Sequence, residues 1–301
     1  MKKIIVLLII GAVFHSTSVY CQEDNELEEE YEYEYEESEE TFNSTRIING
    51  HTVETLYKGY LEFRIEHRFG DIAGSNGGSQ TLYGFDNVAD MRFGFEYGVT
   101  DKFMIGIGRS KGTNAPYRAL FDGFMKYRLL TQKKGKMPLS MAVLGTSSYT
   151  YMNSISDENA LTYFPKLSHR LAYASQLNIA RKFGKRLSLA VMPTVVHRNY
   201  VNYDDINTLF SLGGGARFAL STTFALVVEY YHNFHGDQVR TLNTNSLGVA
   251  IEWITFGHSF TINLTNSKGF GETQFIPYTY EFWQKGQFRL GFCISRTFVK
   301  E

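Results

Sequence analysis

The sequence has few of the residues that would identify a disulfide-rich, metal-binding or helical membrane protein. Its 301 residues include only two cysteines, and one of them lies in a predicted signal peptide. The mature chain therefore keeps Cys293 alone, which excludes an intrachain disulfide and a cysteine-based zinc site. No apolar run is long enough to span a bilayer as a helix. What the chain has instead is 24 Phe, 20 Tyr and 27 Gly in alternating segments, with only five Pro, a composition typical of β-barrels.

Residues 1–21 are predicted to be a secretory signal peptide. Lys2 and Lys3 precede an apolar stretch at residues 4–14, and a more polar stretch ends at Cys21. Lipidation of Cys21 is the alternative, but Tyr20 is bulkier than the small residue that lipoprotein processing prefers before the cysteine. Export predicts a destination outside the cytoplasm.

Residues 22–44 form an acidic tail in this interpretation. Residues 23–40 contain twelve acids and no base, whereas the chain from Thr41 onward has 28 bases and 19 acids. Such an acidic run cannot bury enough apolar surface to fold. The favoured role is a solvated spacer. The alternatives are folding back onto a basic barrel mouth, binding cations, and binding a periplasmic partner.

The stretch Gly59–Phe69 defines the fold class. From Leu61 its odd positions are apolar apart from His67, and its even positions are charged. Because successive side chains of a β-strand point to opposite faces, this strand has one apolar and one ionised face. A transmembrane barrel places the apolar face against lipid and the charges in the lumen.

Eleven similar segments follow, and the gaps between them are alternately short and long. We therefore expect an all-β, antiparallel, up-and-down transmembrane β-barrel of about twelve strands over residues 59–301, with residues 45–58 as a periplasmic lead-in or a lumen segment. Pro193 predicts a bulge and Gly213–Gly215 a bend. The expected strands are 59–69, 88–98, 103–110, 120–132, 139–149, 167–183, 186–198, 208–220, 224–234, 244–254, 258–266 and 287–298.

The inward faces of the first four strands predict a polar cluster in the lumen. Buried charges must be paired or hydrated, so the cluster fits either a salt-bridged, closed barrel that serves a structural or docking role, or the wall of a narrow channel. We favour a channel or transporter for small polar or anionic solutes, with outer-membrane lipid as the other partner. The predicted lumen residues are Glu62, Arg64, Glu66, Arg68, Asp90, Arg92, Glu96, Lys126 and Arg128.

Catalytic and cofactor motifs are not found. His232 and His235 would point to opposite faces of a strand, so they do not form a metal motif. Gly213–Gly215 lacks the following Lys and helix of a phosphate-binding loop. We expect no enzymatic activity, cofactor, metal or nucleic-acid partner. A lipid-processing enzyme is the less favoured alternative.

Several stretches resemble an uncharacterised family of Bacteroidota outer-membrane β-barrel proteins, a domain of unknown function. The resemblance is densest from Thr45 to Gln132 and looser beyond. It implies a barrel in the outer membrane of a Gram-negative bacterium and brings no established activity, so no functional residue is transferred. The similar stretches are Thr45–Glu54, Lys58–Gly59, Glu66–Gly70, Gly84–Arg92, Glu96–Gly98, Gly106–Ser110 and Lys126–Leu130.

Overall fold

The computed structural model describes residues 40–74, 76–87, 90–112, 118–203, 205–234 and 243–299. All of them belong to one compact unit, residues 37–301. The predicted signal peptide and all but the end of the acidic tail lie outside the described residues. No helix in the described part of the chain has the length and apolarity to cross a membrane.

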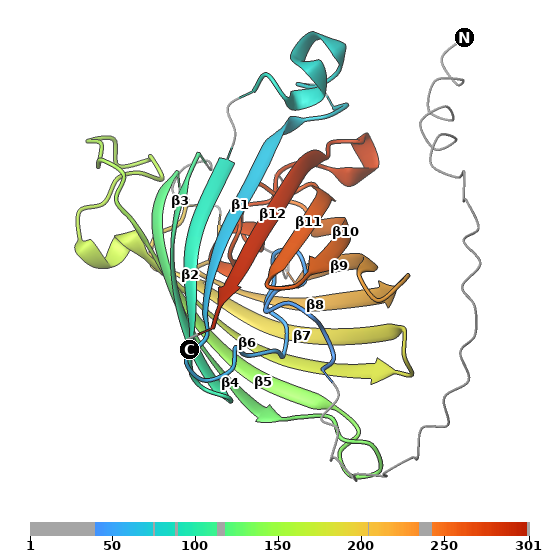
Figure 1. Ribbon diagram of the computed structural model, residues 1–301. Helices are drawn as coiled ribbons and strands as arrows, with labels where there is room; N and C mark the ends of the chain where they lie inside the picture. Colours follow the sequence, from blue (N-terminus) through green and yellow to red (C-terminus); the bar gives the residue numbers. More distant parts are fainter. Residues whose placement is uncertain are drawn as a thin grey trace, which may run out of the picture. The chain divides into compact units, whose positions relative to one another are not determined.

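Twelve antiparallel strands follow one another around a closed barrel, in which β1 pairs with both β2 and β12 (Figure 1). The prediction of an antiparallel, up-and-down, all-β barrel is confirmed. The strands are β1 Leu61–Asp71, β2 Asp90–Thr100, β3 Phe103–Lys111, β4 Ala119–Leu130, β5 Ser140–Thr150, β6 Leu171–Phe183, β7 Leu187–Arg198, β8 Thr208–Ala219, β9 Phe224–Phe234, β10 Ser246–Thr255, β11 His258–Thr265 and β12 Arg289–Phe298.

Seven strands begin one to four residues later than the sequence predicted, namely β1, β2, β5, β6, β7, β10 and β12. Strands β1 and β2 are each displaced by two residues. For β1, a turn with Gly59 at φ 83° precedes the extended chain, which begins at Leu61. A displacement of two residues keeps every side chain on its predicted face. Residues Leu167–Arg170 form the 3₁₀ turn η2 instead of the start of β6.

Two local expectations are wrong. The register of β6 and β7 is the same on both sides of Pro193, so no residue is inserted as a bulge. Proline lacks the N–H donor, and the ladder is interrupted there without a change of register. Gly213–Gly215 stays regularly paired with both neighbours instead of bending. A Cβ at Gly215 would lie 2.3 Å from Ile47 Cδ1, so this glycine is explained by the close approach of another segment.

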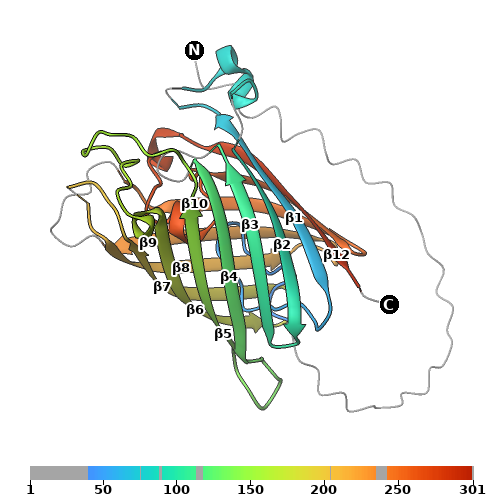
Figure 2. The same ribbon diagram turned by 90° about the vertical axis from the view of Figure 1, so that its left-hand side faces the viewer.

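The two faces of the barrel wall differ as the alternation predicts. On β3, Ile107 is 67% exposed on the outside, whereas Met104 is fully buried inside. The long connections lie at one end of the barrel and the short turns at the other (Figure 2). We call the second end the short-turn rim. Residues 41–58 enter the barrel there and are called the plug.

The plug runs inside the ring of strands (Figure 1) and supplies part of the interior core. Phe42, Ile47, Ile48 and Val53 are buried against small and apolar side chains of the wall. The β11–β12 connection enters from the opposite end, with the short helix α1, Glu272–Phe275, wholly buried. The wall residues of this core are Ala142, Ala174, Ala180, Ala190, Met192, Val196, Leu209, Val227, Tyr231 and Ala250.

Candidate functional site

Arg92 lies at the centre of an ion-pair network on the inner wall of β1, β2 and β4. Its Nη1 is 2.7 Å from Glu66 Oε2, and its Nη2 is 2.6 Å from Asp122 Oδ2. Its Nε also donates to Asp122, which gives the two-bond geometry in which a guanidinium holds a carboxylate most firmly. Arg92 is only 1% exposed, so little water screens these pairs.

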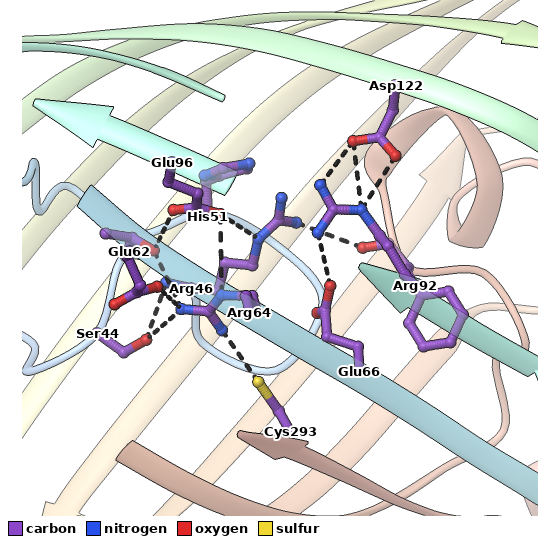
Figure 3. A network of polar contacts seen from close by, with 12 residues as sticks. Ser44, Arg46, His51, Glu62, Arg64, Glu66, Arg92, Glu96, Asp122 and Cys293 are labelled. Carbon is purple, nitrogen blue, oxygen red and sulfur yellow. Dashed lines mark hydrogen bonds and ion pairs between the residues drawn. The ribbon is translucent and has the colours of Figure 1, made fainter. Parts of the chain in front are cut away.

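A second group joins the wall to the plug (Figure 3). Arg64 Nη2 is 2.8 Å from Glu62 Oε1, and Arg64 Nη1 donates to Cys293 Sγ at 3.3 Å. Glu96 accepts hydrogen bonds from Thr45 Oγ1 at 2.7 Å and from Arg46 Nε at 3.4 Å. Because Thr45 and Arg46 belong to the plug, the wall carboxylate holds the plug as well as its neighbours.

The remaining predicted lumen residues also lie on the inner wall. Asp90 is buried opposite Arg68 in the β1–β2 register. Arg68 donates to the backbone carbonyls of Ser267 and Gly269 and to the side chain of Asn49. These three contacts of Arg68 therefore connect the wall with the plug and with the β11–β12 connection.

Lys126 and Arg128 hold the backbone of the plug. Lys126 Nζ donates to the carbonyls of Thr45 and Thr52 at 3.1 and 3.2 Å. Arg128 Nη1 lies 3.4 Å from Glu54 Oε2. A carbonyl is only partially charged, so Lys126, although fully buried, is stabilised here by dipoles as well as by nearby acids.

A plug contact that the predicted cluster omits is made by Glu229 of β9. The plug turns back at residues 47–50, where Ile47 N donates to Gly50 O at 2.9 Å. Glu229 then accepts from three successive backbone N–H groups, those of Ile48, Asn49 and Gly50, at 2.9–3.1 Å. Successive N–H groups of this kind form a concave anion site. Here the anion is a carboxylate of the barrel wall.

The plug meets the β11–β12 connection in the middle of the lumen. His51 N donates to Glu272 Oε1 at 3.2 Å, and Arg46 Nη1 to Phe270 O at 3.4 Å. The rings of Tyr231 and Phe275 pack edge to face at 4.9 Å. Burial and nearby bases, first of all Arg46, hold the pKa of His51 well below its usual value. The two segments are therefore in direct contact inside the barrel.

A cavity of about 450 Å³ lies between the plug and the wall, towards the short-turn rim. Glu54 and Glu62 are among its acidic lining groups, and Ser295 and Thr297 of β12 provide hydroxyls. Burial raises the pKa of Glu54, against the lowering effect of Arg128. The cavity leads from one end of the barrel to Glu62 on the inner wall of β1.

The described residues provide no group of three or more His, Cys, Asp or Glu side chains that could hold a metal. His67 lies on the outer face, where its ring stacks on Phe292 at 5.0 Å. His232 packs edge to face on Phe234, and His235 lies outside the described residues.

A closed antiparallel barrel with an apolar outer wall and a charged inner wall defines a transmembrane β-barrel protein. The chain belongs to the family described as "Membrane bound beta barrel domain (DUF5777)", whose model matches residues 42–298. The prediction of a membrane-bound β-barrel is thereby confirmed. No match is found among curated proteins.

Several solved structures of outer-membrane porins and channels are similar to this chain, with TM-scores below 0.5. The NanC porin and the KdgM porin are each 9% identical to this chain, with a TM-score of 0.49; the alignments cover 80% and 79% of this chain and 100% and 99% of theirs. An outer-membrane channel from Pseudomonas putida F1 is 12% identical, with a TM-score of 0.44, over 82% of this chain and 98% of that one. Another structure holds the KdgM porin in complex with disordered oligogalacturonate.

Proposed function

We propose that the protein is a gated outer-membrane channel for small polar or anionic solutes, closed in this structure by its plug. The observation that carries the proposal is the charged inner wall of β1–β4. An ion-pair network such as that of Arg92 is costly to bury and is often no more stable than apolar packing of the same volume. A wall of this kind suits a lumen through which charged or polar groups pass.

The plug is suited to be the gate because it is not part of the barrel's hydrogen-bond ladder. The backbone hydrogen bonds that fold residues 45–52, Ile47 N to Gly50 O and Thr52 N to Thr45 O, are made within the plug. The wall is closed by β1 and β12 without it. The plug can therefore leave the lumen while every strand pair remains intact.

A closed docking barrel is the second candidate, and the apolar side of the plug favours it. Ile47, Ile48 and Val53 pack against wall residues of β5–β10, and burying a side chain of this kind stabilises by about 1.5–3 kcal/mol. In this alternative the plug is permanent core. The acidic segment 23–40 would then bind a periplasmic partner.

Replacing Glu229 with glutamine should raise the channel's open fraction about fivefold. The charge-assisted bonds to three plug N–H groups would be lost, at a cost of about 1 kcal/mol. Single-channel recording of the refolded mature chain in planar bilayers measures this. Glu252→Gln is the matched control, because Glu252 is also a buried wall carboxylate but pairs with Arg217 of β8, 2.7 Å away.

Absence of conductance in wild type, in Glu229→Gln and in Glu252→Gln alike would contradict the channel and favour the docking barrel. For a conducting protein, Arg92→Glu tests the pathway. Reversing this charge on the wall should shift the preference from anions towards cations. An unchanged preference would mean that solutes do not pass along the β1–β4 wall.

We further propose that the protein has no enzymatic activity and comes from a member of the Bacteroidota. The lumen side chains support the first point, because Arg92, Arg64 and Arg68 are engaged in ion pairs or carbonyl contacts. A phospholipid-turnover assay on the purified barrel tests it. Turnover that disappears on substitution of one inward-facing His or Ser would overturn it.

A further inference from the structure

Two turns of the short-turn rim, which belong to the neighbouring hairpins β4–β5 and β6–β7, carry bases and no acids. The β4–β5 turn and the end of β6 with its following turn border a hollow of about 510 Å³. Neither residues 131–140 nor residues 181–190 contain an acid. The bases of the two stretches are Lys133, Lys134, Lys136, Arg181, Lys182, Lys185 and Arg186.

The hollow is held in shape by Gln132. Its side-chain Nε2 donates to Lys182 O at 3.0 Å, and its Oε1 accepts from Lys182 N at 2.8 Å. Its own backbone N–H donates to Ser140 Oγ at 2.8 Å. The two basic turns are thus tied together across β5, so a ligand between them need not first bring them together.

The hollow lies where the apolar outer wall ends. Leu129 and Phe183 point outward next to it, with 43% and 46% exposure. The Arg181 guanidinium lies over the Phe183 ring, 5.0 Å from its centre. Aromatic residues at this position on transmembrane barrels mark the boundary between the hydrocarbon core and the headgroups, so the basic side chains are at headgroup depth.

Further from the short-turn rim, the outer face of β5 and β6 has an apolar groove of about 890 Å³. At the groove Gly145 of β5 pairs with Ser175 of β6, so two small residues lie side by side. Met125 and Val195 pair with them from β4 and β7 and form the groove's sides. From Ala180 to Ser175 the strand covers about 17 Å, comparable with half of a hydrocarbon core of about 30 Å.

We propose that the outer face of β5 and β6 is a binding site for one anionic phospholipid. The phosphate lies in the basic hollow and an acyl chain lies in the groove at Gly145 and Ser175. An anionic headgroup fits better than a zwitterionic one, because the two turns have no carboxylate to pair with an amine. Clusters of Lys and Arg at the membrane surface attract anionic lipids in this way.

Native mass spectrometry of the full mature chain, released from bilayers that contain equal phosphatidylglycerol and phosphatidylcholine, tests the headgroup. We expect wild type to retain one phosphatidylglycerol preferentially. Lys134→Glu with Lys136→Glu, two exposed lysines that line the hollow, should reduce this retention at least about tenfold, since each base near an anionic surface contributes about fivefold. The matched control is Lys58→Glu with Lys102→Glu, also two exposed lysines of the short-turn rim but outside the hollow.

A second pair of variants tests the groove. A Cβ at Gly145 would meet only Met125 Cγ, at 3.8 Å, so a side chain has room to start here and Gly145→Leu should occupy the groove. Gly214→Leu is the control, because a Cβ there would meet nothing within 4 Å. Gly145→Leu should lower phosphatidylglycerol retention, and Gly214→Leu should not. Equal retention by wild type and by the variant with Lys134→Glu and Lys136→Glu overturns the site. The site is also overturned if millimolar inorganic phosphate displaces phosphatidylglycerol and Gly145→Leu has no effect on retention. The hollow would then bind anions, but no acyl chain would bind in the groove.

Discussion

Replacing Arg92 with alanine should destabilise the barrel by about 3–5 kcal/mol, because it leaves buried carboxylates without their counter-ion. Glu66 and Asp122 both pair with Arg92, at 2.7 and 2.6 Å. The substitution also leaves a void where the guanidinium lay. Urea unfolding of the refolded barrel in vesicles, followed by the fluorescence of Trp253 and Trp283, measures the loss.

The control is Arg296→Ala. Arg296 is also an arginine of a barrel strand, but it is exposed, over the ring of Phe298. Its loss should change the free energy of unfolding by less than about 1 kcal/mol. Equal effects of the two substitutions would mean that the Arg92 network contributes no more than a surface contact.

Removing every charge of the Arg92 network distinguishes the contribution of its ion pairs from that of side-chain packing. In the triple variant Arg92→Met, Glu66→Gln, Asp122→Asn no charge is left unpaired, and the methionine occupies much of the arginine's volume. Since apolar replacement of a complete buried ion pair is often neutral, the triple variant should regain most of the lost stability. The same variant removes charge from the proposed pathway, so it should conduct with weakened ion preference.

The face of each strand could be read from the sequence because it is a local property. In β1, Glu62, Arg64, Glu66 and Arg68 alternate with apolar residues, and all four are less than 7% exposed in the barrel interior. The alternation has a period of two, so even the two-residue displacement of β1 left these faces unchanged. Both predicted bounds are correct only for β9, and the other strands differ from their predicted bounds by one to four residues.

The ion partners of these charges could not be read in the same way. Arg92 of β2 reaches Asp122 of β4 across the intervening β3 strand. Which side chains meet across three strands depends on the register of each pair and on the tilt of the closed barrel. Neither follows from a single strand's pattern, so the sequence indicates a charged lumen without its connections.

The contacts of the plug were the hardest part of the interior to predict from the sequence. Residues 45–58 have no strand periodicity, and the sequence left them as either a lead-in or a lumen segment. Two signals point inward in retrospect: the adjacent pair Ile47–Ile48 before an Asn-Gly turn, and the inward-facing Gly213 and Gly215 of β8. Cβ atoms at these two glycines would meet Tyr231 and Ile47. Glycine in a strand often marks a position that another segment approaches closely.

Gly50→Ala should displace the tip of the plug. A Cβ at Gly50 would lie 2.1 Å from Tyr231 Oη, and Tyr231 is fully buried, with its hydroxyl accepting from Gln176 Nε2 at 2.7 Å. Neither side can yield without losing contacts, and overpacking of this kind costs about 1–3 kcal/mol. Because the same turn carries the N–H groups that bind Glu229, the plug's hold on the wall weakens with it.

If the plug is the gate, Gly50→Ala should raise the open fraction by up to about tenfold, since 1.4 kcal/mol changes an equilibrium tenfold. Adding Tyr231→Phe removes the clashing oxygen and should restore part of the wild-type behaviour. Gly214→Ala, where nothing lies within 4 Å of the new Cβ, should do nothing. A Gly50→Ala barrel that is destabilised, is rescued by Tyr231→Phe and never conducts would make the plug a permanent core and the protein a closed barrel.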